Sequence, residues 1–306
     1  MNKNNVAKSV FKKWFEVLTF ILLTVFSLVL VFLLIYGLFT SVKSNIEFLD
    51  NPVGIPNEWK FENYIDIIKN FSFSVSKNVY IDGYHYIVEA QVRLFPELIV
   101  NTLIYTIGGA FSITFAHCIM AYVVAKFDDW WISKIIFSTV IITMIIPLIG
   151  TASASIAVAK ATGVYDSLLG NMIQKFNFLG MYFLIFHAAF KMQAKDFSEA
   201  AYLDGASEWQ VFFRIMLPLV MNVFGTIMLI KFIEFWNDYS TVLIYLPTHP
   251  TLAYGIYKMS NTTITGLSDG PHRIAGALIL FIPTTIIFAF FNKKFLGNLS
   301  AGGVKG

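Results

Sequence analysis

The sequence predicts an all-α membrane protein whose chain crosses the bilayer as six helices. Of its 306 residues, 57% are hydrophobic and 13% are charged, whereas about a quarter of the residues in a soluble domain are charged. Six apolar segments are spaced along the chain, and a helix needs roughly 20 apolar residues to cross the hydrocarbon core. The single cysteine, Cys118, excludes an intrachain disulfide and a cysteine metal cluster.

The first apolar segment, 18–39, follows a short basic stretch, 1–17. A secretory signal peptide has an apolar core of only about 7–15 residues before its cleavage site. This segment is longer, and the sequence at 38–41 offers no clear cleavage site. We therefore expect an uncleaved first span.

Five further spans are expected within a core region that covers residues 98–291. They are 98–124, 132–158, 178–190, 219–236 and 274–291, of which the fourth is short for a full span. Pro147 and Pro283 are expected to kink the helices that contain them.

Lys and Arg placement predicts the orientation. With the N-terminus inside, the inner segments carry 12 of the 22 basic residues, and the outer segments carry 9 over a longer length. Cytoplasmic loops are enriched in Lys and Arg, so both termini, 1–17 and 292–306, are expected in the cytoplasm. The loop 40–97 is then extracellular, and its length predicts a small folded elaboration. The net charge of +3, without a block of like charge, gives no indication of nucleic-acid binding.

The inner loop 191–218 has the pattern of a short helix. Asp196 and Glu199 have capping-box spacing, in which the two side chains satisfy free backbone N–H groups. Gly205 is expected to end this helix after about two turns, because glycine adopts the left-handed conformation without strain.

A second helix is expected directly afterwards. Ser207 and Gln210 repeat the capping-box spacing, and the aromatic residues that follow suit the membrane interface. Pro218 is expected to break the hydrogen-bond ladder where the fifth span begins. An ordinary cytoplasmic loop is the alternative reading of these residues.

The same loop resembles the EAA motif of the permease subunits of binding-protein-dependent ABC importers. In that family it forms a coupling helix that docks on a cytoplasmic ATPase. The resemblance implies that Glu199 meets a basic residue of the ATPase, and that small residues allow close approach of the two backbones. The matching positions are Glu199, Ala200, Ala201, Asp204, Gly205, Ala206, Ile215, Leu217 and Pro218.

Two further stretches resemble the carbohydrate branch of this family. Phe235–Tyr239 is similar to a Trp-Asn-Asp-aromatic element, and 299–306 is similar to the glycine-rich tail of maltose-type subunits. Residues 59–64 and 101–103 are also typical. In that branch the tail reaches the ATPase, which implies contacts by Gly302, Gly303, Val304, Lys305 and Gly306.

The resemblance implies a permease subunit of an ATP-driven importer for carbohydrates, in particular oligosaccharides, in a bacterial plasma membrane. The expected partners are a second permease subunit forming a heterodimer, two ATPase subunits and an extracellular sugar-binding protein. The chain itself is expected to be no enzyme and to bind no cofactor or metal. It lacks a phosphate-binding loop, so ATP and Mg²⁺ belong to the ATPase.

Three other readings stay open at this point. The first is an ABC importer for another solute, such as a polyamine. A stand-alone secondary transporter would show repeated halves with broken helices, and no repeat is visible. A membrane enzyme would need a nucleophile–base pair or a metal-ligand set, and neither is evident.

Two groups of polar residues are candidate contacts for the transported solute or the binding protein. Ionisable residues in spans often line the path of the transported solute. This makes Lys231, Glu234 and Asn237 candidates for the translocation path. The alternative is that Lys231 and Glu234 simply pair with each other across one helical turn. The resemblance places binding-protein contacts in the loop 240–272, with candidates Asn261, Thr262, Thr263 and Gly266. His117 and His187 lack the neighbouring ligands of a metal site.

Overall fold

The computed structural model describes residues 3–81, 84–146, 150–193, 196–261, 264 and 266–299, with side chains outside 3–11, 76–90, 196 and 292–299. The chain divides into two compact units. Unit 1 comprises Met1–Asn70 and Thr262–Ile279, and unit 2 comprises Phe71–Asn261 and Leu280–Gly306.

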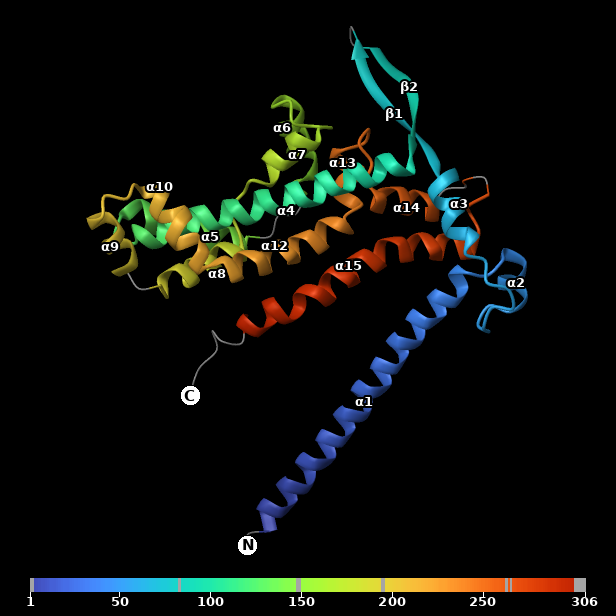
Figure 1. The fold of residues 1–306 in the computed structure, drawn as a ribbon, viewed down its shortest axis with the longest axis horizontal. Coiled ribbons are helices and arrows are strands. Elements are labelled where there is room, and N and C mark those ends of the chain that lie inside the picture. The colour runs from blue at the N-terminus through green and yellow to red at the C-terminus, as the bar shows by residue number, and fades with distance from the viewer. Residues whose placement is uncertain are drawn as a thin grey trace. The chain divides into compact units, whose positions relative to one another are not determined.

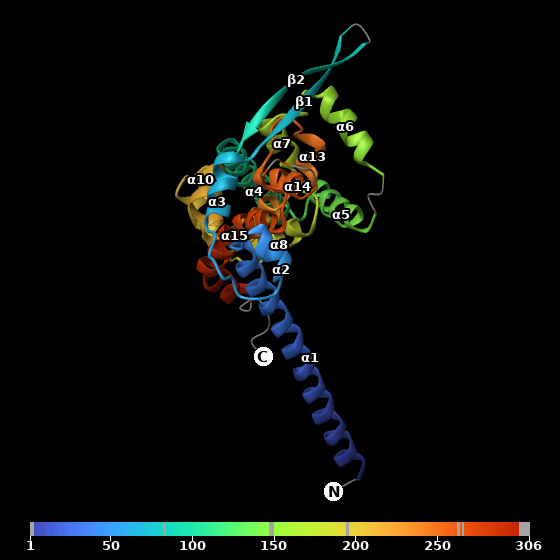
Figure 2. The ribbon, with the colours of Figure 1, turned by 90° about the vertical axis from the view of Figure 1, so that its right-hand side faces the viewer.

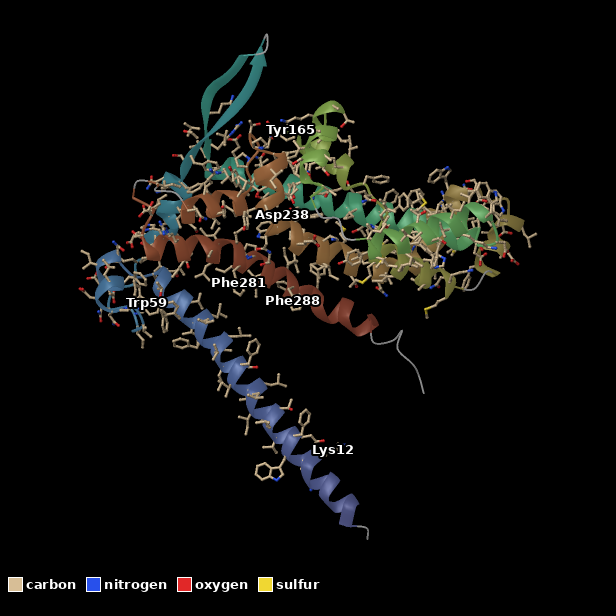
Figure 3. The ribbon with its side chains drawn as sticks, turned by 180° about the vertical axis from the view of Figure 1, so that it is seen from behind. Lys12, Trp59, Tyr165, Asp238, Phe281 and Phe288 are labelled. Atoms are coloured by element: carbon tan, nitrogen blue, oxygen red, sulfur yellow. The ribbon has the colours of Figure 1, made fainter. Side chains whose placement is uncertain are left out.

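Unit 1 contains α1 (Lys3–Ser41), α2 (Asn45–Asp50), α3 (Glu62–Asn70) and the first part of α15 (Gly270–Leu299). The stretch Lys12–Ser41 of α1 has a mean hydropathy of 3.0, and its side chains, with Lys12 toward the N-terminal end, surround the helix in Figure 3. Asn63 Nδ2 donates to the carbonyl oxygens of Ser41 and Lys43 at 2.8 and 2.9 Å. These bonds fix α3 to the end of α1.

Unit 2 is built around α4 (Phe95–Lys126), which packs against α8 (Met181–Lys191) and α12 (Met221–Trp236) (Figure 1). Half of the apolar window of α4 is buried. The core between these helices is aromatic and includes Phe183, Phe186 and Phe212, each at most 2% exposed. Within a bilayer such packing is stabilised by van der Waals contact rather than by the exclusion of water.

Shorter helices complete unit 2. They are α5 (Trp131–Ile145), α6 (Ala152–Ala161), α7 (Leu168–Lys175), α9 (Asp196–Leu203), α10 (Glu208–Val211), the π-helical segment η1 (Phe212–Met216), α11 (Leu217–Leu219), α13 (Ser240–Tyr245) and α14 (Leu252–Asn261).

The described residues are mainly helical, as the fold-class prediction expects, and their strands form one β-hairpin in unit 2. Strands β1 (Ser72–Ile81) and β2 (Tyr84–Leu94) pair antiparallel, with an irregularity between Val75 and Lys77. In Figures 1 and 2 the hairpin extends away from the helices of this unit. The residues between the strands are Asp82 and Gly83, a dipeptide typical of two-residue hairpin loops. The expected folded elaboration of the 40–97 loop therefore includes this hairpin.

The six expected spans are only partly recovered as long helices. Among the described residues, three helices, in α1, α4 and α15, are long and apolar enough to cross a membrane. The segments Glu208–Leu219 and Met221–Trp236 form a fourth if this pair, bent by 75°, counts as one span. Helix α8 has 11 residues, about 16 Å at 1.5 Å per residue. The six-span count therefore remains a prediction.

The third expected span, 132–158, is not one uninterrupted helix. Helix α5 ends at Ile145, Ile146 has an extended backbone with φ −75° and ψ 120°, and α6 begins at Ala152. Ile146 precedes Pro147, and the residue before a proline disfavours the helical conformation. Pro147 itself lies outside the described residues, and Pro283 lies inside the continuous helix α15.

Gly170 provides a test of the packing of α7. A Cβ atom added there would lie 2.4 Å from the carbonyl oxygen of Val164 and 2.7 Å from its Cα. Because the obstacle is backbone, Gly170→Ala is expected to destabilise the protein by about 1–3 kcal/mol, as overpacking does. Thermal unfolding in detergent, followed by tryptophan fluorescence, should give a lower Tm. Leu169→Ala is the control because Leu169 is 70% exposed; equal Tm values for both variants would contradict this packing.

Candidate functional site

Helix α9 has the boundaries that the sequence predicts. It ends at Leu203, and Gly205 has a φ of +80°. The Ala206 N–H donates to Ala201 O at 2.9 Å, and the Gly205 N–H donates to Tyr202 O at 3.0 Å. This pair of bonds is the Schellman motif, which requires the left-handed residue that glycine supplies. The side chain of Asp196 lies outside the described side chains, so the first capping box stays a prediction.

The expected second helix is also confirmed. The Ser207 N–H donates to Gln210 Oε1 at 2.7 Å, the backbone half of a capping box at the start of α10. The break occurs at Val220, two residues after Pro218, and is preceded by the π-helical η1. A proline has no N–H to donate and its ring clashes with the carbonyl four residues earlier, which accounts for the widened turn before it.

The EAA-type residues divide between two faces. Glu199, Ala200, Asp204, Gly205 and Pro218 are exposed. The others are half-buried and pack against the aromatic core of unit 2; they are Ala201, Ala206, Ile215 and Leu217. Four of these nine residues thus pack against the core. Of the five exposed residues, four are small or acidic and lie on α9 or on the turn that follows it.

A polar cluster that sequence reasoning missed joins α9 to α4. Lys126 Nζ donates to Tyr202 OH at 2.5 Å and forms an ion pair with Glu208, and Tyr202 OH donates to Glu208 Oε2 at 2.8 Å. The hydrogen bond from Lys126 lowers the pKa of Glu208. Lys126 and Tyr202 are 76 residues apart in the chain, so no local pattern identifies the pair.

A cavity of about 280 Å³ opens beside this cluster. Its lining includes Lys126, Lys191, Ser198, Glu199 and Tyr202. Lys191 at the end of α8 also forms an ion pair with Asp128. Lys126 therefore holds α9 and α10 to the end of α4, and Lys191 holds the end of α8 to the turn that follows α4.

Two of the three candidate pathway residues, Lys231 and Glu234, pair with each other. Lys231 Nζ lies 2.7 Å from Glu234 Oε2, and Asn237 Nδ2 donates to Ile233 O at 2.8 Å. This is the arrangement that the simple pairing alternative expects, and a pathway role stays a prediction. Beyond them, Asp238 accepts a hydrogen bond from Tyr105 OH at 2.7 Å, which ties the Trp-Asn-Asp element to α4.

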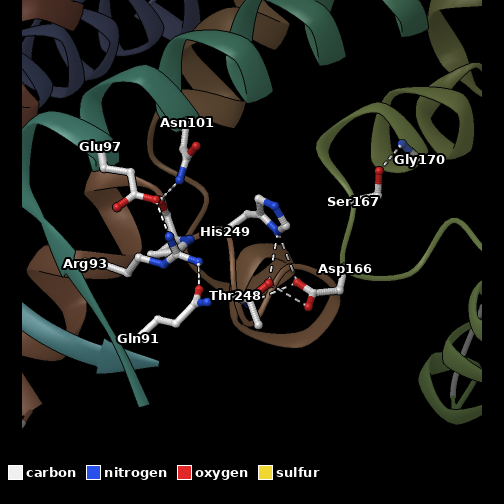
Figure 4. A network of polar contacts seen from close by, with 10 residues as sticks. Gln91, Arg93, Glu97, Asn101, Asp166, Ser167, Gly170, Thr248 and His249 are labelled. Atoms are coloured by element: carbon white, nitrogen blue, oxygen red, sulfur yellow. Dashed lines mark hydrogen bonds and ion pairs between the residues drawn. The ribbon is translucent and has the colours of Figure 1, made fainter. Parts of the chain in front are cut away.

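At the other end of α4, polar bonds hold the segment 246–252 (Figure 4). Asn101 Nδ2 donates to Pro250 O at 3.0 Å. The Leu252 N–H donates to Thr102 Oγ1 at 2.7 Å. Asp166 accepts from the Thr248 N–H at 3.0 Å and from its hydroxyl at 2.7 Å. Burial raises the pKa of Asp166, but hydrogen bonds from His249 and Thr248 outweigh it and the net pKa is lowered.

The remaining predicted contacts fall partly outside the described residues. Asn261 is the last residue of α14, and its side chain donates to Tyr257 O at 2.8 Å. Gly266 has a φ of +79°. Thr262 and Thr263 lie outside the described residues, as does the tail 302–306.

Residues 118–295 match the family described as binding-protein-dependent transport system inner membrane component. The match spans more than half of the chain. The chain belongs to this family. It is therefore a helical, multi-pass membrane subunit of a transport system, and the matched range includes α9, α10 and the core that supports them.

Curated relatives of this permease family align along most of the chain. The diacetylchitobiose uptake permease NgcG of Streptomyces coelicolor is 21% identical and covers 94% of this chain and 88% of its own. YcjP of Escherichia coli, an inner membrane ABC transporter permease, is 25% identical, and the alignment covers 93% of this chain and 94% of YcjP. The polygalacturonan/rhamnogalacturonan permease YtcP of Bacillus subtilis is 27% identical, and the alignment covers 74% of this chain and 82% of YtcP.

A solved structure supports the permease fold. A chain of a bacterial ABC transporter that imports alginate aligns with a TM-score of 0.71 at 20% identity, covering 92% of this chain and 97% of that one. At this identity the likeness supports the fold alone.

The hydroxyl of Tyr202 offers a test of the cluster at the base of α9. Tyr202→Phe removes bonds to both Lys126 and Glu208, and a net hydrogen bond contributes about 0.5–1.5 kcal/mol. We expect amide hydrogen exchange over 197–206 to become several-fold faster while exchange in α12 is unchanged. Tyr239→Phe is the control because Tyr239 makes a ring contact with Tyr257. Unchanged exchange over 197–206 would contradict the role of the cluster.

Asp166 offers a test with a defined pH dependence. Because its folded pKa is lowered, its contribution to stability is present above the unfolded pKa of about 3.9 and disappears as pH falls through the folded pKa. Asp166→Asn is expected to lower Tm at pH 7, and the difference from the unmodified protein should shrink below about pH 4. Asp129→Asn, at an exposed position, should leave Tm unchanged. A Tm difference that is constant from pH 7 to pH 3 would contradict the assignment.

Proposed function

We propose that the chain is the permease subunit of an ATP-driven importer for carbohydrates, and for oligosaccharides in particular, in a bacterial plasma membrane. The observation that carries this proposal is the exposed surface of α9 and of the turn that follows it, which bears Glu199, Ala200, Asp204 and Gly205, while the other face of α9 is anchored in the core. Such an exposed surface is suited to docking on a partner, because small residues let two backbones approach closely.

The partner proposed for this surface is a cytoplasmic ATPase. Two ATPase subunits, which bind ATP and Mg²⁺, would drive two permease subunits, this chain and a different second one. The chain itself would then be a transport subunit and no enzyme. The tail residues 302–306 are proposed as a second ATPase contact, as the family resemblance implies.

Mechanical transmission would run through the polar cluster at the base of α9. Movement of α9 with the ATPase would shift Tyr202 and Glu208, and through Lys126 the end of α4. Helix α4 packs against α8 and α12, so a displacement of its end would alter their packing. Alternation between inward-open and outward-open states requires that ATP favours one of the two.

The substrate proposal rests on the relatives. NgcG and YtcP are named for diacetylchitobiose and for polygalacturonan/rhamnogalacturonan, and an alginate importer has been solved in complex with a saccharide-bound periplasmic protein. We therefore propose an extracellular sugar-binding protein as the donor, with Asn261, Thr262, Thr263 and Gly266 in its contact region. Lys231, Glu234 and Asn237 are proposed as pathway residues.

Orientation and span number belong to the same proposal. Six spans, with both termini in the cytoplasm, put α9 and the excess of basic residues on the cytoplasmic side. An importer for another solute, such as a polyamine, would share this architecture and differ in the solute that its binding protein delivers. A stand-alone secondary transporter would transport without ATP.

Gly205 provides the sharpest test of docking. A Cβ there meets no atom within 4 Å, and Gly163 has the same property with a φ of +72°. Asn tolerates the left-handed conformation better than other side chains, so Gly205→Asn and Gly163→Asn are matched in backbone strain. We expect Gly205→Asn to reduce co-purification of the ATPase and ATP-dependent sugar uptake at least tenfold, and Gly163→Asn to retain both.

Two outcomes would contradict the proposal. One is normal ATPase association and uptake in Gly205→Asn. The other is a purified chain that transports sugar after reconstitution without ATP and without partners, which would favour a secondary transporter.

A further inference from the structure

A second cavity, of about 290 Å³, lies in unit 2 between the end of α4, the start of α5 and α8. Its lining includes Ser133, Lys134, Phe137, Ser138, His187 and Lys191. The volume is close to the lower end of the range for small-molecule sites, roughly 300 Å³. Nothing in the coupling of α9 to α4 uses Ser133, Lys134 or Ser138.

The charges around this cavity leave an excess of positive charge. Lys191 is paired with Asp128, so these two groups offset each other. Lys134 is exposed, and its ammonium group has no ion pair or hydrogen bond within the described part of the chain. His187 is the other titratable group of the lining, and its ring lies 5.0 Å from the ring of Phe137.

The start of α5 adds hydrogen-bond donors. Ser133 is 5% exposed and lines the cavity, yet its hydroxyl has no hydrogen-bond partner among the residues that the structure describes. Trp130 precedes α5 without a side-chain cap, so the first N–H groups of this 15-residue helix lack a capping acceptor. A helix N-terminus carries a partial positive charge and favours anions.

Apolar side chains flank the same polar site. Trp130 and Trp131 are 59% and 70% exposed, and Ile132 and Ile135 are 45% and 53% exposed. Exposed tryptophans are typical of the membrane–water interface, and the exposed isoleucines of α5 suit acyl chains. A ligand here would have an anionic group next to Lys134 and an apolar part beside α5.

We propose that this cavity binds the headgroup of an anionic phospholipid. The phosphate would accept hydrogen bonds from the hydroxyls of Ser133 and Ser138 and pair with Lys134, while the acyl chains lie along α5. Basic pockets between transmembrane helices on the cytoplasmic side are suited to anionic headgroups. A free phosphate ion would leave the apolar flank unused, which favours the lipid. Only the choice of leaflet rests on the proposed orientation.

The test measures lipids that remain bound to the purified transporter complex. The complex is equilibrated in detergent with equal amounts of phosphatidylglycerol and phosphatidylcholine, and bound lipid is counted by native mass spectrometry. One basic residue near a membrane surface changes anionic-lipid affinity about fivefold. We expect Lys134→Gln to reduce phosphatidylglycerol retention about fivefold. The double variant that also carries Ser133→Ala should retain still less, and Lys134→Arg should retain as much as the unmodified complex.

Lys13→Gln is the matched control, because Lys13 is an exposed basic residue on the same proposed side of the membrane and should retain wild-type binding. Phosphatidylglycerol should also raise the Tm of the unmodified complex and not that of Lys134→Gln, since a ligand of the native state stabilises it.

Three results would overturn the proposal. They are equal retention in Lys134→Gln and the unmodified complex, retention of phosphatidylglycerol no greater than that of phosphatidylcholine, and displacement of the lipid by millimolar inorganic phosphate. None of these depends on ATPase binding or sugar uptake, so a failure here is distinguishable from a failure of the proposed transport function.

Discussion

Helix α4 is the element on which the rest of unit 2 depends. It has 32 residues, about 48 Å at 1.5 Å per residue, and it carries polar anchors at both ends. Asn101 and Thr102 bond to the segment 250–252 at one end, and Lys126 bonds to Tyr202 and Glu208 at the other. Between these anchors its buried face packs against α8 and α12. A rigid helix with both ends fixed can carry a displacement from the base of α9 to the far loops.

The sequence predicted the parts of this fold that depend on neighbouring residues. The boundaries of α9 follow from Gly205, because only a residue that adopts a positive φ can close the Schellman motif there. The start of α10 follows from Ser207 and Gln210. The apolar segments of α1, α4 and α15 are long enough to be recognised by length and composition. The family resemblance rests on the same local motifs, and it is confirmed by the match over 118–295.

The parts that the sequence did not predict depend on distant residues or on local competition. The bonds of Lys126, Asn101 and Tyr105 join positions 76, 149 and 133 residues apart, and a single sequence contains no signal for such pairs. The hairpin β1–β2 could have been predicted from Asp82-Gly83 and the aromatic and β-branched residues around it. A kink at Pro147 was expected, but the end of helix α5 at Ile145 was not, because apolar composition continues on both sides of it.

The most direct measurement of the central claim, that α9 docks on an ATPase, is site-specific photocrosslinking. Because Cys118 is buried, Ala200→Cys provides a single reactive thiol on the free face of α9, and Ala161→Cys provides one at an exposed position of α6. Each is labelled with a thiol-reactive benzophenone in the purified complex and irradiated, and the products are identified by mass spectrometry. The account predicts an ATPase crosslink from position 200 and none from position 161. A complex that transports sugar with ATP but gives no ATPase crosslink from position 200 would contradict it.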